Sequence, residues 1–155
     1  MAALGTEVRI PRLAAARLGS DVGLLLTKLR AAGSLLSYPA LADYGLRERS
    51  FAVLTLACSG LEPTPREVAD FLHLDPGQVA AVVDDLEWRG LVARAQGNQD
   101  RRARIIVSTA EGRRMHGKAR AAMDEAELGQ LAMLSAEESG ELKRLLRKAL
   151  WGAAE

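Results

Sequence analysis

The sequence has few residues of several kinds on which common protein functions depend. Its single cysteine, Cys58, excludes an intrachain disulfide and makes a reducing, cytoplasmic compartment the natural expectation. Neither of the two histidines has the spacing to other side chains that a zinc site or a catalytic triad requires. No apolar run approaches the ~18 residues of a membrane-spanning helix, and the first residues lack the apolar core of a secretory signal. We therefore expect a cytoplasmic protein that is not an enzyme, holds no metal or cofactor and has no membrane partner.

Aromatic residues and net charge are also scarce. Aromatic residues make up 4% of the chain, which argues against binding of single-stranded nucleic acid by base stacking. The formal net charge is only +1, but the charges are unevenly distributed. Residues 89–120 hold nine Lys/Arg against two Asp/Glu, a balance of +7, whereas residues 61–88 hold one Arg against seven Asp/Glu, a balance of −6. A basic segment therefore follows an acidic one within a chain whose 155 residues indicate one domain.

The most specific pattern lies in residues 64–112. Helix-start signals occur at 64–67 and 75–78, each a capping box with proline at the first helical position. The second predicted helix runs from 76 to 89 and ends before Gly90. Apolar positions in the two helices predict these buried residues: Val68, Ala69, Phe71, Leu72, Val79, Val82, Val83 and Leu86. Two predicted strands, LVARA and RARIIVS, flank the polar turn GNQD, so a hairpin follows a helix-turn-helix, whose second helix is the one that enters the major groove of DNA.

Helices are also predicted on both sides of this segment. A cap signal at Asp21 starts a helix that should end near Tyr38, because Pro39 follows. Another helix is expected over 46–59, and Ser108 and Ser135 begin two further capping boxes. The first and last helices carry apolar stripes that the small domain formed by the helix-turn-helix and its hairpin cannot cover. These stripes predict a homodimer built from both ends of the chain.

GLVAR followed by DRRARIIVSTAEG resembles the wing and exit helix of the MarR family of bacterial transcription regulators, and the likeness extends over nearly the whole chain. The resemblance implies a mainly α fold with a small β-wing, a twofold dimer, and usually a repressor that a small ligand releases from double-stranded DNA. Within a single MarR-like domain, 1–155, we expect a DNA-binding lobe at 46–108 and dimerisation helices at 11–38 and 109–155.

Gln78 is the residue predicted to read bases, since glutamine can pair with adenine through two hydrogen bonds. The resemblance implies that Arg102 enters the minor groove and that Asp100 steadies it. The remaining predicted DNA contacts are Arg66, Arg89, Arg94, Arg101 and Arg104. The acidic helix-turn-helix opposes DNA binding unless its carboxylates point away, and we expect Asp84 or Glu87 to form an internal ion pair.

Three aromatic residues, Tyr38, Tyr44 and Phe51, are expected near the junction of the first two helices. The resemblance implies a small aromatic or anionic effector there; hinge and core packing is an equally open interpretation. Residues 112–119 nearly match a phosphate-binding loop, but Ala119 replaces the required Ser or Thr. Two further alternatives stay open: a member that docks a protein through its acidic face without binding DNA, and a small-molecule-binding protein or enzyme on the same scaffold.

Overall fold

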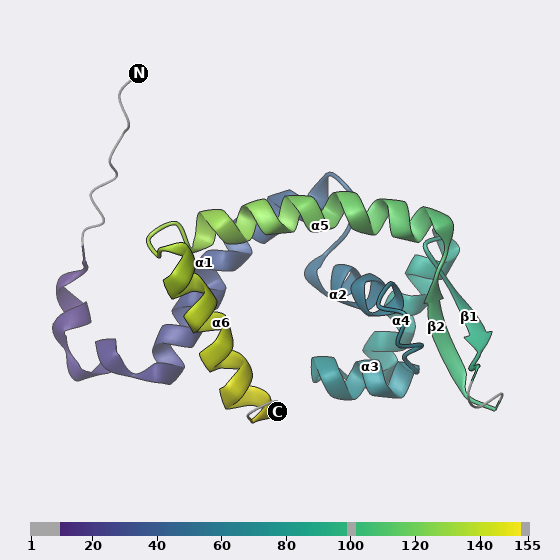
Figure 1. The fold of residues 1–155 in the computed structure, drawn as a ribbon, viewed down its shortest axis with the longest axis horizontal. Helices are drawn as coiled ribbons and strands as arrows, with labels where there is room; N and C mark the ends of the chain where they lie inside the picture. The colour runs from purple at the N-terminus through teal and green to yellow at the C-terminus, as the bar shows by residue number, and fades with distance from the viewer. Residues whose placement is uncertain (1–9, 99–101, 153–155) are drawn as a thin grey trace, which may run out of the picture.

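The computed structural model describes residues 10–98 and 102–152, so the predictions for Asp100 and Arg101 lie outside the described residues. The described part is mainly helical, with one two-stranded antiparallel hairpin (Figure 1). Its helices and strands are η1 (Arg12–Ala15), η2 (Arg17–Ser20), α1 (Val22–Ala42), α2 (Glu48–Ala57), α3 (Pro65–Leu72), α4 (Pro76–Trp88), β1 (Val92–Gln96), β2 (Arg104–Ser108), α5 (Ala110–Gln130) and α6 (Ala136–Trp151). None of the described helices is long and apolar enough to cross a membrane.

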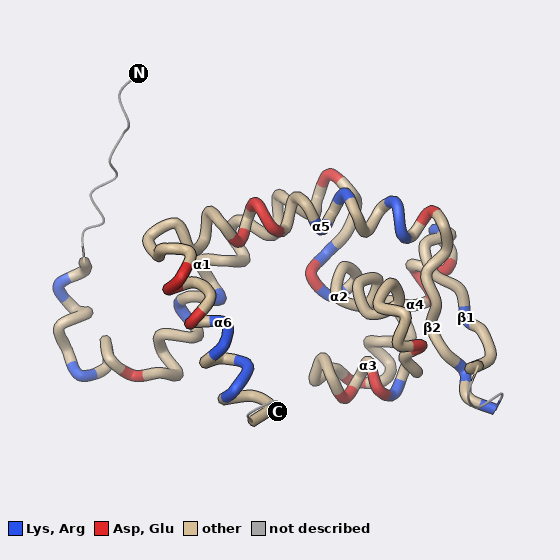
Figure 2. The backbone as a smooth tube through the Cα atoms, in the orientation of Figure 1, with Lys and Arg blue, Asp and Glu red and all other residues tan. Residues whose placement is uncertain are grey.

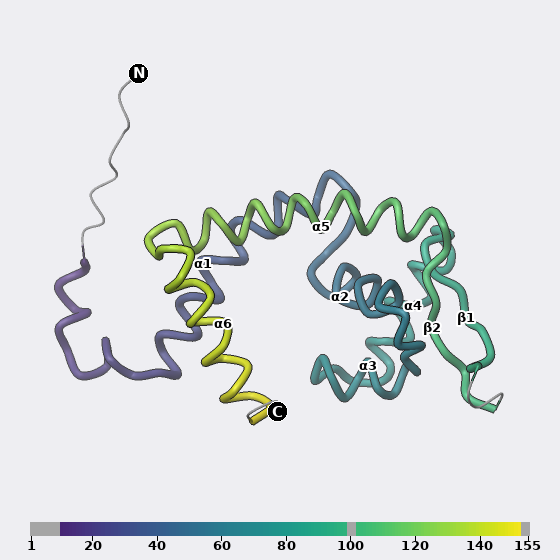
Figure 3. Tube along the Cα trace, in the orientation of Figure 1, coloured from purple at the N-terminus to yellow at the C-terminus, as the bar shows by residue number. Residues whose placement is uncertain are grey.

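The long helices α1 and α5 run side by side and form one arm of the molecule (Figure 3). At one end of this arm lie α2, α3, α4 and the hairpin, and near the other end α6 turns back from α5 toward α3 (Figure 1). Helix α6 and the half of the arm away from α2 to α4 leave large apolar side chains exposed: Leu25, Leu26, Leu36, Leu128, Met133, Leu145 and Leu150.

Helix α1 continues past Pro39, so the prediction that it ends near Tyr38 was wrong. A proline inside a helix removes one backbone hydrogen bond, here the one to the carbonyl of Leu35. Both Leu35 and Pro39 lie on the exposed side of the helix, where water can satisfy that carbonyl. Beyond the proline, Leu41 is only 1% exposed, and its burial holds the last turn against the core.

Most helix starts follow the predicted caps. The capping boxes of Thr64, Asp75 and Ser135 are all present, and the side chain of Asp21 caps α1. The predicted cap at Ser108 was wrong, because Ser108 pairs with Val92 and remains in strand β2. The next residue, Thr109, caps α5 instead, and its hydroxyl accepts a hydrogen bond from the Gly112 N–H at 2.9 Å.

The hydrophobic core lies among the end of α1, helices α2 to α4 and the base of the hairpin. Its largest fully buried side chains are Leu41, Val53, Leu54, Val68, Val79, Val83, Leu86, Val92 and Ile106. Phe71 does not join them, contrary to the prediction, and is 56% exposed. At 100° per residue it lies about 200° around α3 from the buried Ala69, on the edge of the helix away from the core.

The near-match to a phosphate-binding loop has no loop in the structure. Residues 112–119 all lie within α5, and Gly112 packs against the backbone of Leu91. Gly112 therefore serves the packing of α5 on Leu91, whereas Gly117 is exposed and has no close neighbour, so the resemblance to a phosphate-binding loop is limited to the sequence.

Candidate nucleic-acid interface and effector pocket

Helix α4 presents a small, shallow face to solvent. The buried residues Val79, Val83 and Leu86 fix one side of the helix to the core, which leaves Gln78, Ala80 and Ala81 exposed on the other. The side-chain oxygen of Gln78 accepts a hydrogen bond of 3.4 Å from the backbone N–H of Asp75. This bond is long and exposed, so the side chain of Gln78 needs little energy to turn toward a ligand.

The wing carries cations at its outer end. Arg102 and Arg104 are exposed there, close to where the hairpin turns. The other side of the tip is tied down, because the backbone N–H of Asn98 donates to Glu62 at 3.1 Å and the side-chain amide of Asn98 donates to the same carboxylate. A further hydrogen bond of 2.8 Å joins the Ile106 N–H to the Pro63 carbonyl. The wing and the segment before α3 are therefore joined at two levels.

Arg94 neutralises part of the acidic surface of α4. Its guanidinium donates to Asp84 and to Glu87, and its backbone N–H donates to Glu87 at 3.1 Å. These partners, hydrogen bonding by Asp84 first among them, raise the pKa of Arg94 above its usual range. The expected internal ion pair is present, and both carboxylates take part in it. The predicted contact of Arg94 with a DNA phosphate stays untested, and in this structure its guanidinium binds Asp84 and Glu87 of α4 instead.

Arg89 also serves the protein itself. Its guanidinium donates to the carbonyls of Gly45 at 2.9 Å and Tyr44 at 3.0 Å, and lies 3.6 Å from Asp85. These bonds join the end of α4 to the connector between α1 and α2. The side chain of Arg89 is 22% exposed and its guanidinium binds the protein itself, so the structure gives no support to the predicted DNA contact, which stays untested.

Two further cations lie beside α4 that the sequence analysis did not single out. Arg47 and Arg49 are exposed at the start of α2, and both line a hollow of about 910 Å³ that also includes Ala81 and Asp85 of α4. The signal was the local sequence Arg47-Glu48-Arg49, which follows the connector. The sequence alone does not single out these two arginines, because only the fold brings them next to α4. Arg66, predicted to contact DNA, is exposed in the first turn of α3.

The three aromatic residues predicted to line one pocket do not do so. Tyr38 is 60% exposed and lines the hollow beside α4, while Tyr44 lines two shallower hollows next to α5. Phe51 alone faces a hollow of about 450 Å³ between α1, α2 and α5. Of the three residues, only Phe51 lines this hollow, hereafter called the effector pocket after the ligand that the sequence analysis predicts; binding of a ligand there stays a prediction.

The effector pocket combines an apolar wall with polar groups at its rim. Leu26, Leu29, Phe51 and Met123 form the apolar part, and Arg30, Ser34, Ser37, Glu48 and Gln130 supply polar atoms. Arg30 donates to Glu48 at 3.0 Å, and Glu48 also accepts from Ser37 at 2.7 Å and from Ser34 at 3.2 Å. These bonds, the one from Ser37 foremost, lower the pKa of Glu48. Arg30 remains 74% exposed, so its guanidinium is accessible from the pocket mouth.

His116 supports the pocket from behind. Its ring stacks on Phe51 with centroids 5.7 Å apart, and its Nε2 lies 3.2 Å from the hydroxyl of Thr55. Burial, and then the positive charge of Arg120, lower the pKa of His116. Among the described residues, no group of three or more His, Cys, Asp or Glu side chains is placed to hold a metal ion.

The arrangement of a helix-turn-helix, a basic-tipped hairpin and long flanking helices has clear counterparts. The MarR family model matches residues 46–103. The chain is similar to CouR from Rhodococcus jostii RHA1, solved with p-coumaroyl-CoA, at 34% identity over 90% of this chain and 99% of CouR, with a TM-score of 0.81. A MarR family transcriptional regulator from Rhodococcus sp. RHA1 gives 33% identity, the same coverage and a TM-score of 0.82.

A MarR family protein of Mycobacterium tuberculosis, solved in complex with DNA, gives 27% identity over 83% of this chain and 97% of that one, with a TM-score of 0.70. No curated protein sequence matches the chain. The fold of the chain and its similarity to these proteins identify it as a DNA-binding transcription regulator of the winged helix-turn-helix class. The chain belongs to the MarR family.

Proposed function

We propose that this chain is a homodimeric repressor that binds a pseudo-palindromic DNA operator and is released by a small aromatic or anionic ligand. The observation that carries the proposal is the small exposed face of α4, which has Arg102 and Arg104 on one flank and Arg47 and Arg49 on the other. Arginines on both flanks can contact phosphates while the helix between them lies in the major groove.

The proposed roles divide the chain as the sequence suggested. Residues 46–108 read DNA, and the helices of 11–38 and 109–155 form the dimer. Support for the dimer comes from the exposed apolar side chains at the far end of the α1–α5 arm, which a second copy would cover. Two lobes related by twofold symmetry would then bind half-sites about one helical turn apart, ~10 bp centre to centre.

The acidic charge of the helix-turn-helix does not exclude this mode. Asp84 and Glu87 are paired with Arg94, and Asp85 lies near Arg89, so each of the three carboxylates of α4 has an internal cation. Attraction then comes from Arg102 at the wing tip, which Asp100 would steady, with Arg101 and Arg104 adding phosphate contacts. Alanine methyl groups on α4 can meet thymine methyl groups, and Gln78 can pair with adenine.

Selection of bound fragments from random duplex DNA tests this function directly. A recovered palindrome supports a dimeric DNA-reading regulator, and failure to enrich any duplex would favour a member that docks another protein instead. Arg102→Ala should weaken binding to the selected operator and to other duplexes alike, and it should reduce the dependence of log affinity on log salt by about one unit. Gln78→Ala should relax preference at one base pair of each half-site, at a cost of ~1–3 kcal/mol. Unchanged affinity in Arg102→Ala would refute the wing contact.

The effector pocket suggests the class of ligand. Its apolar wall suits one aromatic ring, and the exposed Arg30 beside two serine hydroxyls suits a carboxylate or phenolate. Relatives bind such molecules: CouR was solved with p-coumaroyl-CoA, and the mycobacterial protein with salicylic acid. We infer that a ligand anion competes with Glu48 for Arg30 and so loosens the junction of α1 and α2.

Salicylate, p-coumarate and p-coumaroyl-CoA are suitable probes, with release of operator DNA and thermal stabilisation as readouts. Phe51→Leu and Arg30→Gln should both weaken the response, because one removes the ring that faces the pocket and the other the cation. Tyr44→Phe is the matched control, since Tyr44 lines different hollows. If the control responds as poorly as the two test variants, the effector site lies elsewhere.

A further inference from the structure

Helix α6 has few ties to the rest of the protein. None of its residues is buried, although its sequence carries an apolar stripe. Near its middle, Lys143 forms an ion pair with Glu127 of α5. At its end, the ring of Trp151 stacks on the ring of Phe71 in α3, with centroids 6.1 Å apart and planes 12° from parallel. The second contact joins residues from the two parts of the chain that the proposed function separates.

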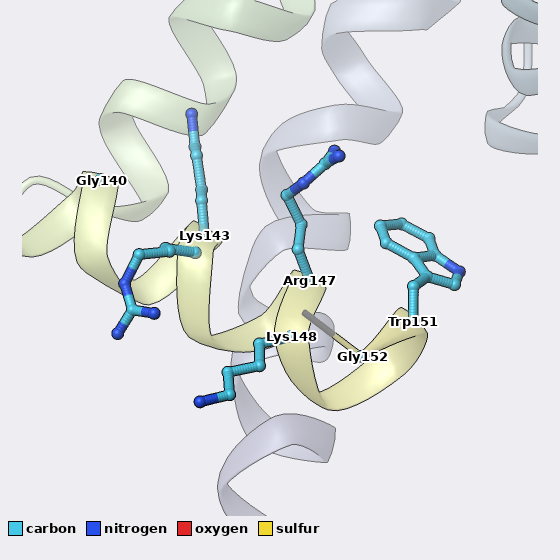
Figure 4. A pocket seen from close by; sticks show the side chains of 7 residues that line it. Gly140, Lys143, Arg147, Lys148, Trp151 and Gly152 are labelled. Atoms are coloured by element: carbon cyan, nitrogen blue, oxygen red, sulfur yellow. The ribbon is translucent and has the colours of Figure 1, made fainter. Parts of the chain in front are cut away.

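The Phe71–Trp151 stack explains two side chains that are otherwise poorly placed. Phe71 is 56% exposed and Trp151 58% exposed, so neither belongs to the core. Arg147, one turn before Trp151, places its guanidinium 5.3 Å from the Trp151 ring centroid, within the range of a cation–π interaction. Figure 4 shows Arg147 and Trp151 leaving α6 in the same direction, whereas Lys148 points elsewhere. The tryptophan is thus held by an aromatic ring and by a cation.

Charge favours the same approach. From its middle to its end, α6 carries Lys143, Arg144, Arg147 and Lys148 along a hollow of about 550 Å³. Helix α3 carries the exposed acidic residues Glu67 and Asp70. Figure 2 shows the basic end of α6 turned toward the helix-turn-helix that holds these acidic residues. The described residues form no direct ion pair between α3 and α6, so the charges act over a longer range that salt can screen.

We propose that α6 docks on the first helix of the helix-turn-helix through the Phe71–Trp151 stack, and that this contact couples the dimerisation helices to the DNA-binding lobe. The acidic surface of α3 then faces the protein's own C-terminal helix instead of DNA. A docked lobe has less freedom to lose when it binds, so the contact strengthens operator binding. This coupling rests on the proposed DNA-binding function, whereas the docking itself does not.

The docking is tested first without DNA. Trp88→Phe removes the other tryptophan, which is 87% exposed on α4, and leaves Trp151 as the only indole. In that background Phe71→Ala should make Trp151 fluorescence easier to quench by acrylamide, whereas Phe71→Tyr should leave the quenching unchanged. Equal quenching in all three proteins would overturn the docking, whether or not the protein binds DNA.

The coupling is then tested on the selected operator. Trp151→Ala and Phe71→Ala should each weaken binding by about threefold to tenfold, the factor that corresponds to an aromatic pair, and the double variant should be no weaker than either single one. Trp151→Phe should retain most of the affinity. Wild-type affinity in both alanine variants, tighter binding, or simple additivity would overturn the coupling, while failure of the wild-type protein to bind any duplex refutes the proposed function alone.

Discussion

Two glycines of α5 should respond in opposite ways to the same substitution. A Cβ at Gly112 would lie 1.9 Å from the carbonyl oxygen of Leu91 and 2.8 Å from its carbonyl carbon, whereas a Cβ at Gly117 meets nothing within 4 Å. Replacing glycine by alanine inside an exposed helix stabilises it by about 1 kcal/mol. Gly117→Ala should gain that amount, because the site is exposed and open.

Gly112→Ala should lose more than the helix gains. The clash is with backbone, which cannot rotate away, and Leu91 is fixed by the hydrogen bonds that its carbonyl accepts from the Thr109 N–H at 3.1 Å and the Thr109 hydroxyl at 3.2 Å. Overpacking typically costs ~1–3 kcal/mol, and an approach of 1.9 Å to a backbone atom places this site at the upper end, about 3 kcal/mol. After the helix gain of about 1 kcal/mol, the net loss should be about 2 kcal/mol. The start of α5 must then move away from the base of the wing.

Thermal and urea unfolding at one fixed protein concentration measure both variants, since the stability of a dimer depends on concentration. The two free energies should differ by roughly 3 kcal/mol, which corresponds to a separation of about 6–12 °C in Tm for a chain of this size. Equal stability of Gly112→Ala and Gly117→Ala would refute the close contact between α5 and Leu91.

Three further outcomes follow from the side chains described above. Arg94→Ala should lower stability by about 1–2 kcal/mol in thermal unfolding, because it leaves two neighbouring carboxylates without their cation, and adding Glu87→Gln should restore part of the loss. Arg89→Ala should also lower stability by about 1–2 kcal/mol, because its guanidinium donates to the Tyr44 and Gly45 carbonyls. The same variant should leave the salt slope of operator binding unchanged. A reduced salt slope would show instead that Arg89 contacts a DNA phosphate. The pKa of His116 in the folded protein is lowered from its usual value of 6.5, so the imidazole takes up a proton in the unfolded chain before it does so in the folded one as the pH falls. The free energy of unfolding should therefore decline below pH 6.5. His116→Leu should flatten that decline when unfolding is measured from pH 7.5 to 5.

Local signals in the sequence were sufficient for most of the fold. Capping boxes at Thr64, Asp75 and Ser135 depend on residues three apart, and the valine stripe of α4 depends on helical spacing alone. The errors at Pro39 and Ser108 arose where tertiary structure overrode a local rule. Burial of Leu41 carried α1 past a proline, and pairing with Val92 kept Ser108 in a strand.

The candidate site was less accessible to sequence reasoning. Whether an arginine contacts DNA or its own protein depends on which acceptors lie opposite it in space, and those of Arg89 are 44 and 45 residues away along the chain. Arg47 and Arg49 gained interest only when the fold brought them beside α4. In the same way, Tyr38, Tyr44 and Phe51 are close in sequence, but each lines a different hollow of the folded chain.

The hydrogen bonds between the wing and the segment before α3 have a mechanical consequence. Because Asn98 is hydrogen-bonded to Glu62 and Ile106 to Pro63, the helix-turn-helix and the wing should tilt together as one rigid body at the start of α5. With its 21 residues, α5 is a rod of about 30 Å. A tilt of only ~5° at one end of such a rod displaces the other end by roughly 3 Å, close to the ~3.4 Å rise of one base pair. In the proposed dimer, a rotation of this size would therefore be enough to put the two lobes one base pair out of step with their half-sites.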